Sequence, residues 1–384
     1  MLVSSRRTLA QVAALVAFAA AMAGAQAQPS GINANRILIG QSAPLTGINA
    51  ELGNDIRNGA LAYFRKVNEA GGVHGRKIEL VSIDDDNKVP RAEANTKKLV
   101  EEDGVFALFG YASATLSRPA LPIVEKYRVP FIAPFTGADP MRVFNKYVYN
   151  MRGSYAEELD KIVEHFEPLG IKRFSIVYYD DVVGRENLTA VERALTKRNL
   201  KPVSVAAFAD RAKPDIEGGV KKIAAGQPDV VILTTLYKAT ADFVRLAQKS
   251  GMSAQMASNS FPGASPLAKE LGKDGQGLIV ATVVPPPTKR SLPVVQEYQQ
   301  AIELQVGTKA YSFTSLESYI GAKVLVEALK RAGPKPTREG LMQSLDAMKA
   351  FDVGGYAVSF AHDNHNGSSF VELTVIGQGL KFNY

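Results

Sequence analysis

The feature that most constrains this chain is a repeated alternation between strand-like and helix-like periods, which begins at Arg36. Short apolar runs are followed by stretches in which apolar residues recur every three or four positions, as on one helix face. In the first part of the chain we expect strands at 37–40, 78–83, 105–109 and 129–133, with helices around 56–67, 92–100 and 116–127. Alternation at this spacing predicts βαβ units and a parallel sheet that helices cover on both faces.

The same pattern restarts after about residue 150, so we expect a second α/β unit of similar plan. Its predicted strands are 173–179, 203–208, 229–235 and 254–258, and the tail adds a strand at 277–284 and a helix at 315–331. Residues 351–384 contain only strand-like pieces and turn signals such as Asn366-Gly367. We therefore expect the tail to be shared between the two units, with several crossings between them.

The N-terminal segment has the layout of a secretory signal peptide. Arg6 and Arg7 form a positive start, residues 12–23 are apolar, and Ala25-Gln26-Ala27 fits a cleavage site. The apolar run is shorter than the about 20 residues that span a bilayer as a helix. We expect cleavage near Ala27 and ordinary secretion, with twin-arginine export as the alternative that the paired arginines leave open.

Composition excludes several classes of protein. The chain has no cysteine, which rules out disulfides, thiolate–metal sites and a cysteine-linked lipid anchor. Its net charge is +7, but basic and acidic residues are interleaved without a lysine-arginine block, so nucleic-acid binding is not expected. A chain of 384 residues is long for one domain and comfortable for two.

Two loops of the first unit are candidates for binding a ligand. Each follows a predicted strand, and ligands of parallel sheets sit outside the carboxyl ends of the strands. In the loop 110–115, Ser113 could cap the next helix and leave the amides of Ala114 and Thr115 facing outward, which suits a carboxylate. In the loop 134–138, Thr136 offers a hydroxyl and Gly137 a closely approaching backbone. Purely structural roles, a cap and a turn, are the alternative for each loop.

Enzyme motifs are mostly missing. The chain lacks GxxxxGK[ST], HExxH, GxSxG and a GxGxxG after a strand. Asp84-Asp85-Asp86 could hold a divalent cation, but capping or preceding the next helix is the favoured interpretation. His362 and His365 have no third ligand nearby in the sequence. We therefore expect neither catalysis nor a metal or other cofactor.

Several segments resemble the periplasmic leucine/isoleucine/valine-binding protein family, the substrate-binding proteins of ABC importers. They include "ILIGQSAPLTG", "FALFGYASAT", "VPFIAPFTGA", "FSIVYYDDVVGRENL" and "PDVVILTTLYKATADFVRLAQKSG". The resemblance covers about residues 36–384. It implies two Rossmann-like lobes, 28–150 with 281–351 and 151–280 with 352–384, joined by a three-segment hinge that closes on a ligand. It also implies a periplasmic monomer that delivers a small carboxylate, most simply an aliphatic amino acid, to an inner-membrane ABC permease.

The resemblance also implies which residues would contact the ligand. From the first lobe these are Leu52, Ser113, Ala114, Thr115, Phe135, Thr136, Gly137 and Tyr311, and from the second lobe Tyr155, Tyr237, Ser260 and Phe261. Hydroxyl and backbone groups of the two loops would hold the ligand's carboxylate and amino group.

Two departures from the family pattern concern the ligand's amino group. Val183 stands where leucine-type members carry a tyrosine, and Ser260 stands where they place a glutamate against the ligand's ammonium. Asp181 could replace that glutamate, although a helix cap before Gly184 explains it equally well. The sequence therefore leaves open an amino acid or another small carboxylate or amide as ligand, and a sensor in place of an importer component.

Overall fold

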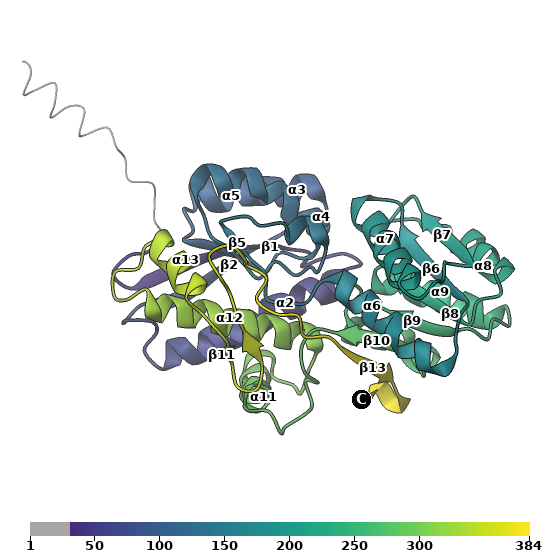
Figure 1. Ribbon diagram of the computed structural model, residues 1–384. Coiled ribbons are helices and arrows are strands. Elements are labelled where there is room, and N and C mark those ends of the chain that lie inside the picture. Colours follow the sequence, from purple (N-terminus) through teal and green to yellow (C-terminus); the bar gives the residue numbers. More distant parts are fainter. Residues whose placement is uncertain (1–30) are drawn as a thin grey trace, which may run out of the picture.

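The computed structural model describes residues 31–384 and contains two α/β lobes that lie side by side (Figure 1). The predicted signal peptide, residues 1–27, lies outside the described residues. Each lobe is built around its own sheet, so the two-unit plan predicted from the alternation of periods is confirmed. Among the helices of residues 31–384, none is long and apolar enough to cross a membrane.

The first lobe contains a five-stranded parallel sheet in the order β2-β1-β3-β4-β5. The strands are β1 (Arg36–Ala43), β2 (Lys77–Asp84), β3 (Ala107–Phe109), β4 (Phe131–Ile132) and β5 (Val148–Tyr149). Strand β4 is shorter than predicted. Its hydrogen bonding nevertheless continues one residue further, because the Ala133 amide donates to the Tyr149 carbonyl at 2.8 Å.

Helices from both ends of the chain cover this sheet. They are α2 (Ala50–Glu69), α3 (Val89–Lys97), α4 (Ser113–Ser117) and α5 (Leu121–Tyr127), joined from the tail by α11 (Pro293–Val306), α12 (Phe313–Arg331) and α13 (Arg338–Asp346). Figure 1 shows α3, α4 and α5 on one side of the sheet and α2 and α12 on the other. A Cβ on Gly59 would lie 2.1 Å from the Ser315 carbonyl oxygen, so glycine is what lets α2 and α12 approach closely.

The second lobe contains a seven-stranded sheet in the order β14-β13-β10-β9-β8-β6-β7. Strands β6 (Phe174–Tyr179), β7 (Ser204–Phe208), β8 (Val230–Thr234), β9 (Gln255–Ser258) and β10 (Ile279–Thr282) are parallel, and β13 (Glu372–Ile376) and β14 (Phe382–Asn383) are antiparallel additions from the tail. The helices are α6 (Tyr155–Phe166), α7 (Val182–Thr196), α8 (Ile216–Ala225), α9 (Tyr237–Lys249) and α10 (Ala264–Leu271).

Side chains alternate between the two faces of this second sheet, as the period of a strand requires. Ile176 and Ile232 pack with residues of α6 and α7, whereas Val177 and Leu233 join the large core that includes residues of α8 and α9. The strands are therefore apolar on both faces, which explains their continuous hydrophobic runs in the sequence.

The chain crosses between the lobes three times, and the crossings are bonded to one another. The first is residues 150–154, the second leaves β10 at Val283, and the third is residues 367–371. The Tyr356 hydroxyl donates to the carbonyls of Met151 and Val283, both at 3.1 Å. The Gly367 amide donates to the Asn150 carbonyl at 2.8 Å. All three crossings are thus tied together at one place.

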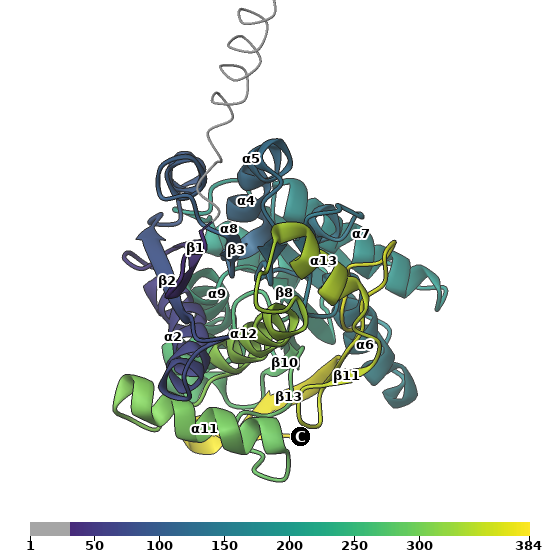
Figure 2. The same cartoon turned by 90° about the vertical axis from the view of Figure 1, so that its left-hand side faces the viewer.

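The tail before the third crossing contacts the first lobe. Strands β11 (Phe351–Asp352) and β12 (Ala357–Val358) form a small hairpin, and His365 stacks on Tyr149 of β5 with ring centroids 3.9 Å apart. The proposed lobe limits, 28–150 with 281–351 and 151–280 with 352–384, therefore place residues 352–366 with the second lobe although these residues pack against the first. Figure 2 views the molecule from the side of α11 and α12 and shows the tail passing these helices toward β13.

Candidate functional site

The two loops predicted to bind a ligand lie next to each other in the structure. Ala112 and Phe135 form a parallel bridge beyond the ends of β3 and β4. The Phe135 amide donates to the Tyr111 carbonyl at 2.8 Å, and the Ser113 amide donates to the Phe135 carbonyl at 3.1 Å. Leu52 of α2 packs with Ala112 and Phe135 in a small apolar cluster. The candidate residues of the first lobe therefore share the carboxyl end of the sheet, with one exception, Tyr311.

Ser113 does not cap the following helix. Helix α4 begins at Ser113 itself, with Ala112 in the N-cap position and no side chain bonded to the helix start. Ser113 has φ +63°, a left-handed conformation that is uncommon for residues other than glycine. Within residues 31–384 its hydroxyl makes no hydrogen bond. The backbone conformation thus presents a hydroxyl without a partner, beside Ala114 and Thr115.

The second loop is pressed against the first crossing. The Gly137 carbonyl accepts a hydrogen bond from the Tyr155 amide at 2.8 Å. A Cβ on Gly137 would lie 2.8 Å from the Tyr155 nitrogen and 2.9 Å from the Gly153 oxygen, so only glycine fits without a shift. The Thr136 hydroxyl is buried and accepts from the Ala138 amide at 3.2 Å. The loop therefore links the first sheet to the start of α6.

Residues of the second lobe face these loops. Tyr155 is the first residue of α6, and its ring meets Phe261 edge to face with centroids 5.8 Å apart. Tyr237 is the first residue of α9, and its hydroxyl donates to the Ile48 carbonyl of the first lobe. Tyr311 differs, because its hydroxyl bonds to Glu303 on α11, within the first lobe.

Asp181 caps a helix and forms an ion pair. Its carboxylate accepts from the Gly184 amide at 3.0 Å, which makes it the N-cap of α7, and it pairs with Arg211 at 2.6 Å. It also lies in a groove of about 380 Å³ between the lobes. The other residues that line this groove are Thr115, Arg118 and Pro119 from the first lobe and Val182 and Val183 from the second.

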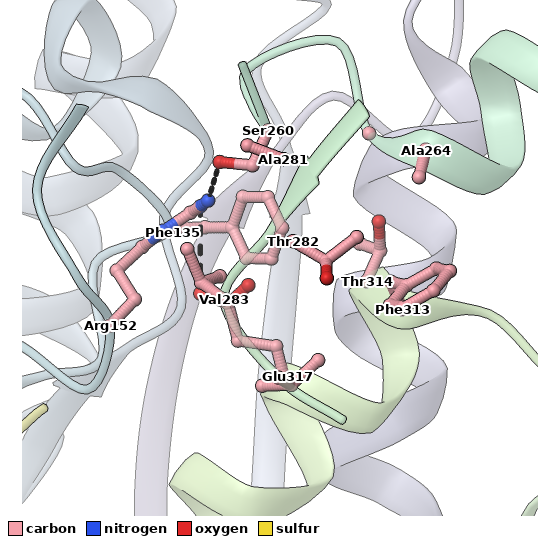
Figure 3. Close-up of a pocket in the computed structure, with 12 residues that line it drawn as sticks. Phe135, Arg152, Ser260, Ala264, Ala281, Thr282, Val283, Phe313, Thr314 and Glu317 are labelled. Atoms are coloured by element: carbon pink, nitrogen blue, oxygen red, sulfur yellow. Dashed lines mark hydrogen bonds and ion pairs between the residues drawn. The ribbon is translucent and has the colours of Figure 1, made fainter. Parts of the chain in front are cut away.

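A smaller pocket, which we call the hinge pocket, lies beside the crossings (Figure 3). Its free space is about 10 Å³, room for about one water molecule. In Figure 3, Arg152 lies on one side of it and Phe313 and Thr314 on the other. The lining residues come from both lobes and from the second crossing: Phe135, Arg152, Ser260, Gly263, Ala264, Ala281, Thr282, Val283, Val284, Phe313, Thr314 and Glu317.

Arg152, in the first crossing, is the central charge of the hinge pocket. Its side chain is only 1% exposed, and it forms ion pairs with Glu158 of α6 at 3.6 Å and with Glu317 of α12 at 3.5 Å. It also donates to the Ser260 hydroxyl. Its guanidinium lies 4.8 Å from the centre of the Phe135 ring and 5.7 Å from that of Tyr155. One buried cation thus connects a crossing, both lobes and two aromatic rings.

Burial dominates the electrostatics of this cluster. It raises the pKa of Glu158 to about 6, although Arg152 and the two bonds from Ser260 oppose the shift. It raises the pKa of Glu317 to about 7, with Arg152 alone opposing it. Both pKa values rise because a carboxylate loses its hydration when it is buried, and the single guanidinium of Arg152 must compensate two carboxylates.

Residues 36–379 match the sequence model of a family described as periplasmic binding protein. The match covers most of the chain. The chain belongs to the periplasmic binding protein family. The resemblance inferred from the sequence segments is thereby confirmed, and so is the two-lobed α/β fold.

Known proteins of similar sequence and structure agree with this assignment. An "Amino acid binding protein" of Pseudomonas aeruginosa is 25% identical over 296 residues, which are 74% of this chain and 78% of the relative. A substrate-binding periplasmic protein from Ralstonia solanacearum is 31% identical, with a TM-score of 0.84, over 89% of this chain and 98% of that one. A possible leucine/isoleucine/valine-binding protein from Rhodopirellula baltica is 27% identical, with a TM-score of 0.85, over 92% and 97% of the two chains.

Sequence reasoning missed three members of this periplasmic binding protein's charged cluster: Arg152, Glu158 and Glu317. One signal was available for Glu158. The buried face of α6 contains Tyr155, Leu159, Ile162, Val163 and Phe166, and Glu158 falls on that face with helical spacing. An acid on an apolar face is seldom buried unless it is paired, so it predicts a buried partner. No comparable signal singles out Arg152, because an arginine after a short strand resembles any surface residue.

The acidic run Asp84-Asp85-Asp86 precedes α3 but does not cap it, since the N-cap residue is Lys88 and no side chain bonds there. Asp84 instead accepts the amide of Leu45 at 2.8 Å and the hydroxyl of Thr46 at 2.6 Å, which holds the loop after β1. Among residues 31–384, no group of three or more histidine, aspartate or glutamate side chains has the arrangement of a metal site.

Proposed function

We propose that this protein is the substrate-binding component of an ABC importer and captures a small carboxylate, an aliphatic or branched-chain amino acid, between its two lobes. The lobes close on the ligand by bending at the three crossings. The role proposed is binding and delivery, without catalysis.

One observation carries the proposal: two hydroxyl-bearing loops at the carboxyl end of the first sheet face the second lobe beside a bonded set of crossings. Ser113 presents an unpartnered hydroxyl there, next to the Ala114 amide, and a hydroxyl and amide of this kind suit a carboxylate. A short ligand held at this end would contact the opposite lobe only if the lobes come together. The arrangement therefore supports capture by closure rather than binding to one rigid surface.

The relatives support an amino acid as the ligand. The relative from Pseudomonas aeruginosa is named for amino-acid binding, and the solved structure from Rhodopirellula baltica is named for leucine, isoleucine and valine. In our proposal the carboxylate lies at Ser113, Ala114, Thr115, Thr136 and Gly137. The aliphatic part would then be enclosed by the apolar candidates Leu52, Phe135, Tyr155, Tyr237 and Phe261, with Asp181, Ser260 and Tyr311 further from it.

Location and partner follow from the same proposal. Export by the signal peptide would place the protein in the periplasm, where the closed form, as a monomer, would dock on an inner-membrane permease. Deletion of the gene should then abolish high-affinity uptake of the ligand. Normal uptake together with loss of a transcriptional or chemotactic response would instead identify a sensor.

A thermal-shift screen of the twenty amino acids and of small carboxylates tests the ligand. A ligand at 100 times its dissociation constant stabilises the folded protein by about 2.7 kcal/mol, which is a clear shift in melting temperature. We expect the branched-chain amino acids to produce it. Shifts with carboxylates or amides but with no amino acid would contradict the amino-acid assignment while leaving the binding role in place.

A further inference from the structure

The ligand's amino group needs an acceptor, and the two residues suggested for it by the sequence are already bonded. The Ser260 hydroxyl donates to Glu158 at 2.8 Å and accepts from Arg152, and the Ser260 amide donates to Glu158 at 2.6 Å. Asp181 accepts from the Gly184 amide and pairs with Arg211. Both side chains thus already have hydrogen-bonding or charged partners within the protein.

Glu317 differs from these residues because its carboxylate is almost without partners. It comes from the second turn of α12, lines the hinge pocket, and has a side chain 9% exposed. In the part of the chain that the structure describes, its one polar contact is the 3.5 Å ion pair with Arg152, which is too long for a good hydrogen bond. Glu158, by contrast, has Arg152 and two short bonds from Ser260.

Charge in the hinge pocket is also unbalanced. Arg152 brings one positive charge against the two carboxylates of Glu158 and Glu317, so full ionisation leaves one buried negative charge uncompensated. Such a charge is costly unless a cation joins it or a proton neutralises it. Burial accordingly raises the pKa of Glu317 to about 7. An arriving ammonium group would restore neutrality.

A second feature points to a ligand at the same place. The Thr314 hydroxyl is buried, lines the hinge pocket and has no hydrogen-bond partner among the described residues. The Nη1 and Nε atoms of Arg152 also lack hydrogen-bond partners, but they are donors and suit an acceptor oxygen, not an ammonium group. Buried polar atoms in folded proteins are nearly always bonded, so the unpartnered Thr314 hydroxyl, which can accept a hydrogen bond, indicates a missing donor in this pocket.

We infer that Glu317, assisted by the Thr314 hydroxyl, receives the ligand's ammonium group and thereby selects amines over simple carboxylates. This inference rests on the proposed amino-acid function and adds a residue of the first lobe, on α12, to it. Phe135 and Phe313 line the same pocket, and their rings favour a cation over a neutral group. The present free space holds about one water, so the pocket must open slightly, or exchange that water, when the amine enters.

The test compares ligands that differ only in the amino group: L-leucine with 4-methylpentanoate, and L-valine with 3-methylbutanoate, by calorimetry at pH 8. The variant is Glu317→Gln. The control is Glu327→Gln, which changes an acid on the same helix that pairs with Arg331. A third variant, Glu186→Gln, tests a different acid near the lobe interface, whose pKa is also raised to about 7. We expect Glu317→Gln to weaken amino-acid binding by about tenfold to a hundredfold. Binding of the desamino acids should change less than about threefold, and both other variants should behave like wild type.

The wild-type protein gives a second measurement that does not depend on a variant folding. The charged and titratable groups around Glu317 are Arg152 from the crossing, Glu158 from α6 and Tyr356 from the tail, and Tyr155 of α6 lies against Arg152. Below pH 7 a proton competes with the ammonium for Glu317. We therefore expect the preference for leucine over 4-methylpentanoate to fall, by up to about tenfold per pH unit, between pH 7 and 5.5.

The outcomes separate the inference from the proposed function. If Glu317→Gln keeps the full amino-acid preference, or if that preference does not change with pH, Glu317 is a protonated structural acid and the inference is wrong. The same holds if the preference disappears in Glu186→Gln instead. If the wild-type protein binds the desamino acids as well as the amino acids, the inference fails while carboxylate capture stands. If it binds neither pair, the proposed ligand class is wrong and the inference with it.

Discussion

The backbone conformation of Ser113 is energetically unfavourable. Its φ of +63° places a serine where glycine is usual, and a strain of this kind persists only where the surrounding structure enforces it. Here the bridge between Ala112 and Phe135 fixes the backbone on one side, and the short helix α4 fixes it on the other. The result is an unpartnered hydroxyl on a backbone that is held in place, which suits the recognition of a small anion.

We expect Ser113→Ala to weaken binding of the amino-acid ligand by about tenfold, because one hydrogen bond to a charged group is lost. Since that hydroxyl has no protein partner, the melting temperature without ligand should not change. Ser117→Ala is the control. The Ser117 hydroxyl donates to the Ser113 carbonyl at 2.7 Å, so its loss should lower stability by about 1 kcal/mol and affect affinity less. Wild-type affinity in Ser113→Ala would remove this residue from the site.

At the scale of single residues, the sequence predicts positions better than partners. Ser113 and Thr136 could be placed at strand ends because hydrophobic runs stop there. The ion pairs of Arg152 could not be foreseen, because they join residues 152, 158 and 317 through tertiary packing alone. Ser260 shows the same limit. The family pattern places it beside the ligand's ammonium group, but its hydroxyl is bonded to Glu158 and Arg152 and it lines the hinge pocket.

At the scale of helices and strands, periodicity identified most parallel strands of both lobes and the main helices of the first, whereas the helices of the second lobe were expected without bounds and α11 was not predicted. Failures occurred where tertiary contacts rather than local pattern set the structure. In the sequence, the segment of the β11–β12 hairpin resembles a connection between the two lobes. The third crossing comes later, at 367–371, where Gly367 bonds to Asn150 of the first crossing. No local signal marks that pairing, since the two residues are more than 200 positions apart in the chain.

Helix α6 is the element that joins the first crossing to the hinge pocket. It begins with a capping box: the Ser154 hydroxyl accepts from the Glu157 amide at 3.0 Å, and the Glu157 carboxylate accepts from the Ser154 amide at 2.7 Å. Tyr155 and Glu158 lie in the first turn that this box fixes. The start of α6 thus sets the positions of an aromatic ring and a buried acid at once.

We expect Ser154→Ala to lower the free energy of unfolding by about 1 kcal/mol and also to weaken ligand binding several-fold, because the first turn of α6 would fray. Thr337→Ala removes a similar cap from α13, where Thr337 accepts from the Gly340 amide at 2.9 Å. That control should lose comparable stability in urea denaturation and keep wild-type affinity. Equal affinities in the two variants would show that the box at Ser154 supports the fold and not the site.

At the scale of the whole molecule, buried carboxyl groups should determine how stability depends on pH. Burial is the largest cause in each of five raised pKa values, about 6 for Asp55, Asp85 and Glu158 and about 7 for Glu186 and Glu317. Between pH 5 and 7 the folded state therefore holds protons that the unfolded state has released. Stability must fall as pH rises through this window.

We expect the urea midpoint of the ligand-free protein to be higher at pH 5.5 than at pH 7.5. Carboxyl groups with lowered pKa values, such as Asp84 and Glu297, lose their stabilising effect only at lower pH and do not cancel the trend. Glu317→Gln should reduce the difference between the two midpoints, since the amide cannot ionise. A midpoint that rises from pH 5.5 to 7.5 would show that these acids are not buried as described.

The polar contacts between the lobes bear on how the whole molecule moves. Besides the cluster at Arg152, Tyr237 bonds to the Ile48 carbonyl, the Phe313 amide donates to the Ser265 hydroxyl at 3.4 Å, and Lys269 pairs with Glu51 at 3.2 Å across the lobes. The lysine side chain is 69% exposed, and exposed ion pairs contribute at most about 1 kcal/mol. We expect these polar contacts to add little to the closed form, so that bound ligand supplies part of the free energy that keeps the lobes closed.

We therefore expect the ligand-free protein to populate open forms and ligand to reduce its radius of gyration in small-angle scattering, with no change in molecular mass. Bending is confined to the crossings, which Tyr356 and Asn150 tie together, so each lobe should keep its own shape while the distance between the lobes shrinks. Tyr237→Phe removes one hydrogen bond between the lobes, the one to the Ile48 carbonyl. It should weaken ligand binding several-fold yet leave the scattering of the ligand-saturated protein unchanged.

A scattering profile that is identical with and without saturating ligand would contradict closure. In that case the groove between Thr115 and Val183 would have to admit the ligand with the lobes in their present position.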